Sequence, residues 1–168
     1  MTPALEGDSL GLPFNIDIAI EDTGWSEVMS EPEHICSKAI KAALSVLDTS
    51  RHGELSIALV NDASIQRLNR EHRGKDKPTN VLSFPNDGPA PLLGDIVLAR
   101  ETLQREATER NLDVLDHVTH LLVHSFFHLQ GFVHDNDADA LIMETLEIAA
   151  LASLGIDNPY QIKEHLNS

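Results

Sequence analysis

The eleven residues from His124 to His134, HSFFHLQGFVH, constrain the fold of this chain more than any other segment. His124 and His128 are four residues apart, so on a helix both side chains project from one face, about one turn apart. Gly131 follows three residues later, and glycine readily takes the left-handed conformation that ends a helix. The sequence therefore predicts a helix that stops near Gly131 and a chain that turns back to bring His134 beside the other two histidines.

Three neutral imidazoles that converge from one side form a metal-binding set. They leave a fourth ligand position open, which is typical of catalytic rather than structural zinc sites. Imidazole nitrogens suit Zn²⁺, with cobalt, nickel and copper as competitors. The alternative is that these are packed core or capping histidines, but three at this spacing disfavour it. We predict that His124, His128 and His134 bind one zinc ion per chain.

The same spacing occurs in the H-E-x-x-H-x-x-G-x-x-H zinc signature of the metzincin proteases. In those enzymes the glutamate after the first histidine acts as the general base. This chain has Ser125 at that position, and a serine hydroxyl cannot accept a proton at neutral pH. The sequence thus predicts the metal cage of a peptidase without its base.

Further titratable residues lie on both sides of this motif. His117 and His120 share the helical face of His124, and we interpret His120 as a neighbour of the metal site or a packing residue rather than a ligand. Several acidic residues follow the third histidine and are expected mostly to favour a helix start. One of them can orient a ligand imidazole through its other nitrogen. These are Asp135, Asp137, Asp139, Glu144 and Glu147.

Basic residues are concentrated in one short segment of an acidic chain. The net charge is -15, which argues against nonspecific coating of nucleic acid, because that needs a basic surface. Yet five of the 12 Lys and Arg residues fall within eleven positions, against only two acidic residues there. They are Arg67, Arg70, Arg73, Lys75 and Lys77. Charge alone leaves two interpretations open, a solvated helix end or a contact for an anionic ligand.

The order of periodic segments predicts an α+β fold. Alternating residues indicate strands near 14–20, 55–59, 81–84 and 95–98, and helical patterns cover 33–47, a short segment around 62–70, 99–110, 113–130 and 137–154. We expect a single domain over residues 1–168, with 1–12 as a loose arm. In it, a small four-stranded sheet is covered by about five helices. The metal site lies on a helix of the C-terminal half and the turn after it.

Targeting signals are not apparent in the sequence. No stretch approaches 18 apolar residues, so no membrane span is expected. The N-terminus has neither a basic start nor an apolar region, so it is not expected to be a secretory signal. A single cysteine, Cys36, cannot form an internal disulfide. These features together predict a cytoplasmic protein.

Several separate stretches of the sequence match one known family in the same order. They are LNREHRGKDKPTNVLSFP (68–85), LLGDIVLA (92–99), HSFFHLQGFVH (124–134), the following helix with Met143 and Glu147, and LGIDNPY (154–160). Through these stretches the chain resembles, over nearly its whole length, the YbeY-type endoribonucleases, also called rRNA maturation factors.

The family pattern around the metal is H-G-x-L-H-L-x-G-Y-D-H. This chain keeps the three histidines, Leu129 and Gly131. It departs from the pattern at four positions, which are Ser125 for Gly, Phe127 for Leu, Phe132 for Tyr and Val133 for Asp. The metal cage is therefore expected to survive, without the tyrosine hydroxyl and the aspartate carboxylate of the family.

The resemblance implies a zinc-dependent endoribonuclease that prefers single strands. It implies action in 3′ end maturation of 16S rRNA and in ribosome quality control, with small-subunit rRNA and ribosomal particles or ribosome-associated proteins as partners. The functional arginine of the family falls on Arg73, in the basic segment, and we expect Arg73 to pair with the scissile phosphate while Lys75 and Lys77 hold flanking phosphates. Two alternatives stay open: a metallopeptidase-like hydrolase, and a non-enzymatic ribosome-assembly factor with a structural metal.

Overall fold

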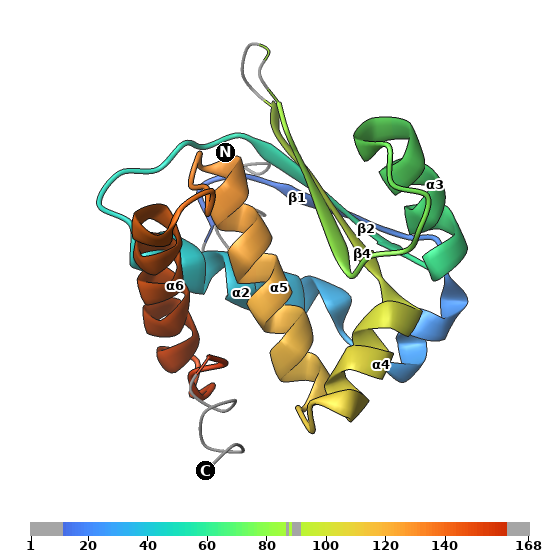
Figure 1. The fold of residues 1–168 in the computed structure, drawn as a ribbon. Helices are drawn as coiled ribbons and strands as arrows, with labels where there is room; N and C mark the ends of the chain where they lie inside the picture. The colour runs from blue at the N-terminus through green and yellow to red at the C-terminus, as the bar shows by residue number, and fades with distance from the viewer. Residues whose placement is uncertain (1–11, 87, 89–91, 161–168) are drawn as a thin grey trace, which may run out of the picture.

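A computed structural model describes residues 12–86, 88 and 92–160 of the chain (Figure 1). Within them lie four strands, five α-helices and one 3₁₀ helix. The strands are β1 (Ile16–Ile20), β2 (Glu54–Val60), β3 (Val81–Pro85) and β4 (Leu92–Ala99). The helices are η1 (Thr23–Glu27), α2 (Pro32–Ser45), α3 (Asp62–Arg73), α4 (Arg100–Glu109), α5 (Val114–Leu129) and α6 (Asp137–Ala152).

The four strands form one mixed sheet in the order β1-β2-β4-β3. β1, β2 and β4 run parallel, while β3 pairs antiparallel with β4 and lies at the edge of the sheet. Helices connect the parallel strands, as such crossovers require. The antiparallel edge strand β3 borders a cavity that is also lined by His124, His128 and His134.

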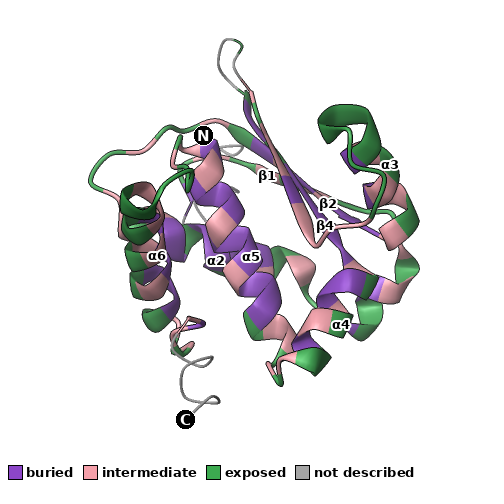
Figure 2. Ribbon diagram, in the orientation of Figure 1, coloured by how far each residue is buried: buried purple, intermediate pink, exposed green. Residues whose placement is uncertain are grey.

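Helices cover both faces of the sheet unequally. On one face, Leu55, Ile57 and Leu59 of β2 pack into a large core with α2 and α5. On the other face, Ile65 of α3 packs against Val97 of β4 in a smaller cluster. Figures 1 and 2 show α3 alone on its side of the sheet and α2, α5 and α6 on the opposite side. This alternation along β2 is the one that the sequence predicts.

α5 is the central helix of the larger layer. Ten of its 16 residues are buried, and Figure 2 shows them along most of its length. The side chain of Asp113 caps its first turn by accepting hydrogen bonds from the backbone N–H groups of Leu115 and Asp116. A helix held this firmly positions the side chains on its remaining face precisely enough to build a site.

The structure confirms the predicted fold class, an α+β arrangement with a four-stranded sheet and five α-helices in the described part of the chain. One element was not predicted, the 3₁₀ helix η1, whose buried Trp25 donates a hydrogen bond from Nε1 to the Val60 carbonyl at 2.9 Å. Five residues are too few to show a period. Of the expected arm, residues 1–11 lie outside the described residues, and its last residue, Leu12, is buried in the core.

Among the described helices, none is both long and apolar enough to cross a bilayer.

Candidate metal centre

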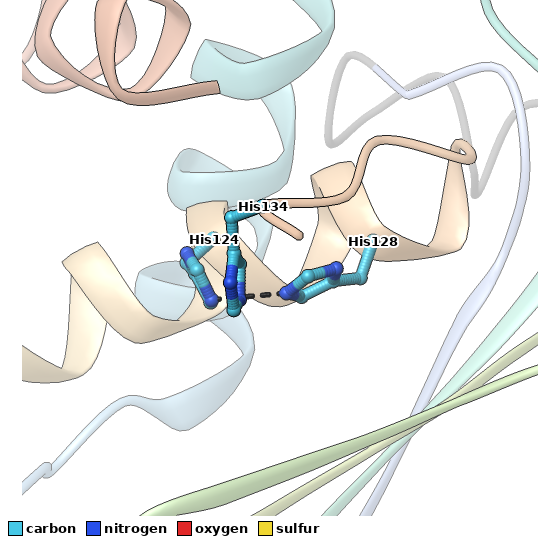
Figure 3. A group of neighbouring side chains, drawn as sticks. All are labelled: His124, His128 and His134. Atoms are coloured by element: carbon cyan, nitrogen blue, oxygen red, sulfur yellow. Dashed lines mark hydrogen bonds between the residues drawn. The ribbon is translucent and has the colours of Figure 1, made fainter. Parts of the chain in front are cut away.

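Three histidines come together at the C-terminal end of α5 (Figure 3). His124 and His128 belong to the helix, and His134 lies in the segment between α5 and α6. Gly131 adopts the left-handed conformation, with φ of 99°, and so allows the chain to turn back after the helix. One nitrogen of each imidazole lies within 4.8 Å of the corresponding nitrogens of the other two. The convergence predicted from the sequence is therefore present.

Hydrogen bonds at Nδ1 fix the orientation of the two helical imidazoles. His124 donates from Nδ1 to Oε2 of Glu147 at 2.7 Å, and His128 donates from Nδ1 to the Phe132 carbonyl at 2.9 Å. Because carboxylate and carbonyl oxygens only accept, each Nδ1 carries the proton and each Nε2 presents a lone pair when the ring is neutral. Both rings are thereby held with the Nε2 lone pair available to a metal ion.

The Nε2 atoms of His124 and His128 are 3.1 Å apart. Two lone pairs at this distance repel unless a cation or a proton lies between them. A tetrahedral zinc ion with bonds of ~2.0–2.1 Å places its ligand atoms roughly 3.3 Å apart. With His134 as the third donor, the residues fit a metal ion that keeps one open position.

Glu147 of α6 is the acidic residue that orients His124. It is 0% exposed and also accepts hydrogen bonds at Oε1 from His120 Nε2 at 2.7 Å and from the Tyr160 hydroxyl at 2.6 Å. Burial by itself would raise the pKa of Glu147, but the hydrogen bonds from His120 and His124 outweigh it and lower the pKa to about 2. A carboxylate that is ionised at neutral pH thus lies behind the three histidines. His120 is a neighbour of the site through Glu147, as the sequence suggested.

Burial and charge also act on His128. Its burial, and then the nearby positive charge of a protonated His124, lower the pKa of the imidazole below its usual value. The neutral form is the one that binds metals, so this environment favours ligation at neutral pH.

The three histidines line a cavity of about 780 Å³ that also reaches the basic segment. Arg73, Lys75 and Lys77 line the same cavity, together with residues of the edge strand β3. The Arg73 guanidinium donates from Nη2 to the Ser83 carbonyl of β3 at 3.3 Å. The basic segment and the histidine segment, about 50 residues apart in sequence, therefore line one cavity. The cations of the basic segment lie in the same cavity as the three imidazoles.

The four departures from the family pattern fall into two groups. Ser125 and Phe127 are both 0% exposed and lie on the buried side of α5, and neither lines the cavity. Phe132 and Val133 line the cavity. Phe132 holds His128 through its backbone carbonyl, a contact that does not depend on a tyrosine hydroxyl.

The chain is similar to a family of known proteins. The family model described as "Endoribonuclease YbeY" matches residues 18–155. The chain belongs to the YbeY family. A relative from Rhizobium johnstonii, named "Endoribonuclease YbeY", is 46% identical over 163 residues, which cover 88% of this chain and 94% of the relative. Another of the same name, from Methylocella silvestris, is 48% identical over 151 residues, covering 87% and 85%.

A solved structure has the same fold. The solution structure of TM1509 from Thermotoga maritima matches with a TM-score of 0.53 and 21% identity, covering 83% of this chain and 91% of that one. At this identity the likeness supports the fold alone. The α+β architecture of this chain is thus also found in a solved structure.

Two residues of the site carried no sequence signal as site residues. Arg51 lines the cavity from the loop before β2, but it stands apart from the basic segment. Tyr160 reaches Glu147 from beyond α6. Its stretch, LGIDNPY, belongs to the resemblance, yet only the folded structure shows the contact between Tyr160 and α6.

Proposed function

We propose that this chain is a zinc-dependent endoribonuclease that cleaves single-stranded RNA. The observation that carries the proposal is the cavity in which three metal-binding imidazoles share their walls with Arg73, Lys75 and Lys77. Its relatives are named as endoribonucleases, and a polyanionic substrate suits a basic cavity in an otherwise acidic chain.

His124, His128 and His134 would hold the zinc ion. Zinc at such a site lowers the pKa of a bound water to about 7 and polarises phosphoryl oxygens. Arg73 would pair with the scissile phosphate through its planar fork and stabilise the charge that develops on the phosphoryl oxygens. Lys75 and Lys77 would hold neighbouring phosphates and so fix the strand across the cavity.

A proton must leave the attacking water, and the cavity offers one carboxylate among its described lining residues. This is Asp135, which directly follows the third histidine and is exposed. We assign to Asp135 the acceptance of this proton. Ser125 is excluded from that role because it is buried in the helix interior and does not line the cavity.

The cellular role that we propose is 3′ end maturation of 16S rRNA and ribosome quality control in the cytoplasm. The net charge of -15 weakens general attraction to RNA. Ribosomal particles or ribosome-associated proteins would then supply much of the targeting, since their basic groups complement an acidic surface.

A side-by-side cleavage assay tests the function. Zinc-loaded and metal-free protein would be incubated with single-stranded RNA, single-stranded DNA and peptides. We expect zinc-dependent cleavage of the RNA only. The metzincin glutamate is absent, and the cations that line the cavity suit a polyanion rather than a peptide, so we expect negligible peptide hydrolysis. Peptide cleavage with intact RNA would favour the metallopeptidase, and no cleavage even with ribosomal particles would favour an assembly factor with a structural metal.

A further inference from the structure

Arg51 is a cationic residue of the cavity that lies far in sequence from the basic segment. It lines the same cavity as the histidines and Arg73, and its side chain is exposed. Hydrogen bonds of its backbone N–H and carbonyl groups hold the residue in place. The Arg51 N–H donates to Gln130 Oε1 at 2.6 Å, and Gln130 Nε2 donates to the Arg51 carbonyl at 2.8 Å. Gln130 is the C-cap of α5, so Arg51 is tied to the helix that carries the metal ligands.

The two guanidinium groups are placed along β3 by their contacts with backbone oxygens. Arg73 donates to the Ser83 carbonyl in the middle of the strand. Arg51 donates from Nη2 to the Asn86 carbonyl, just beyond the end of the strand, at 3.4 Å. The two oxygens are three residues apart, which corresponds to roughly 10 Å of extended chain. The two contacts therefore hold the guanidinium groups at different points along β3, which suits two phosphates of one strand better than a single shared phosphate.

The Arg51 contact leaves most of its donors available. A guanidinium has five N–H donors, and the bond to Asn86 is long and therefore weak. At the other end of β3, Lys75 and Lys77 precede the strand and line the same cavity. Cationic side chains thus lie near the start, the middle and the end of the edge strand β3. This arrangement fits a chain of regularly spaced anions.

We propose that Arg51 binds a phosphate of the RNA at a nucleotide other than the scissile one, so that the single strand lies along the edge of β3 from Lys77 past Arg73 to Arg51. This inference rests on the proposed function and deepens it, because it assigns a path to the substrate. It predicts that Arg51 contributes to binding of an RNA strand long enough to reach it, and that it contributes nothing to metal binding.

The test is the salt dependence of RNA binding by the zinc-loaded protein, measured with a fluorescent single-stranded oligoribonucleotide under conditions without turnover. Each phosphate contact on a single strand contributes about 0.7 to the slope of log K against log salt. We expect Arg51→Ala to reduce the slope by about 0.7 and to weaken binding up to roughly fivefold at low salt. Lys41→Ala, at an exposed lysine of α2 that does not line the cavity, is the control for an equal change of charge and should leave the slope unchanged.

The alanine variant should fold normally, because both bonds to Gln130 use the backbone of residue 51. Arg51→Lys, which keeps the charge, should restore the slope. The inference is overturned if wild-type protein binds and cleaves RNA while Arg51→Ala keeps the wild-type slope, or if the lysine variant is as defective as the alanine variant. RNA that neither binds to nor is cleaved by the wild-type protein would instead overturn the proposed function, and the inference with it.

Discussion

Replacement of Glu147 by glutamine gives the sharpest test of how the metal site is built. The carboxylate accepts three hydrogen bonds of 2.6–2.7 Å, at Oε1 from His120 and Tyr160 and at Oε2 from His124. Such charge-assisted bonds contribute ~1.5–3 kcal/mol each. A glutamine has almost the same shape but replaces one acceptor oxygen by an NH₂ donor, so it cannot accept on both sides.

Each orientation of the amide has a defined cost. With NH₂ toward His124, two donors meet, and the imidazole avoids this only by moving its proton to Nε2, the nitrogen that must bind the metal. With NH₂ toward His120 and Tyr160, His124 keeps its partner, but the carboxylate charge that strengthens its basicity is lost. Loss of such a partner typically weakens metal binding 10–100-fold, which is about 1.4–2.7 kcal/mol.

The same substitution should destabilise the metal-free protein. At least one buried donor loses its acceptor, which costs about 1–3 kcal/mol in the free energy of unfolding. For a chain of 168 residues this lowers Tm by roughly 2–12 °C. Zinc affinity would be measured by competition with a chromophoric chelator, and Tm by calorimetry of the metal-free protein.

Glu144→Gln provides the matched control, because it makes the same change in α6 at a half-buried position one turn earlier. It should leave zinc affinity within about twofold of wild type, since Glu144 accepts no hydrogen bond from the three histidines. If Glu147→Gln bound zinc as tightly as Glu144→Gln and melted at the wild-type temperature, the carboxylate would not be what holds His124.

Three further substitutions test the residues that line the cavity. His134→Ala should bind zinc far more weakly than wild type, and full stoichiometric zinc in the variant would contradict the ligand assignment. Chelation of the metal should lower the wild-type Tm, because the ion ties α5 to the chain beyond Gly131. Arg73→Ala should greatly reduce RNA cleavage without loss of zinc or folding, and Arg73→Lys should restore it only in part, because an ammonium lacks the bidentate fork; wild-type cleavage by the alanine variant would refute a catalytic role. Asp135→Asn should lower kcat ~10²–10⁴-fold with zinc content unchanged. A wild-type rate and pH profile in this variant would show that a group other than Asp135 accepts the proton of the attacking water.

Local patterns in the sequence predicted those features whose geometry depends on neighbouring residues alone. A spacing of four residues places His124 and His128 on one helical face, and Gly131 supplies the left-handed turn, so the convergence of the histidines could be predicted without any knowledge of packing. The alternation along β2 likewise identified a strand buried on one face. Since η1 has only five residues and no period, the element that places Trp25 in the core could not be predicted.

Tertiary packing decided which distant groups complete the site. Five acidic residues were candidates to orient an imidazole, and only the packing of α6 against α5 selects Glu147 for His124. The position of Arg73 in the cavity depends on how α3 ends beside the edge strand β3. Arg51 and Gln130 are 79 residues apart and meet only in the folded chain. Periodicity reports which face of an element is buried, but it does not report which element covers that face. The sequence by itself therefore predicted the convergence of His124, His128 and His134, whereas the groups that orient them and the surface that surrounds them were decided by the tertiary structure.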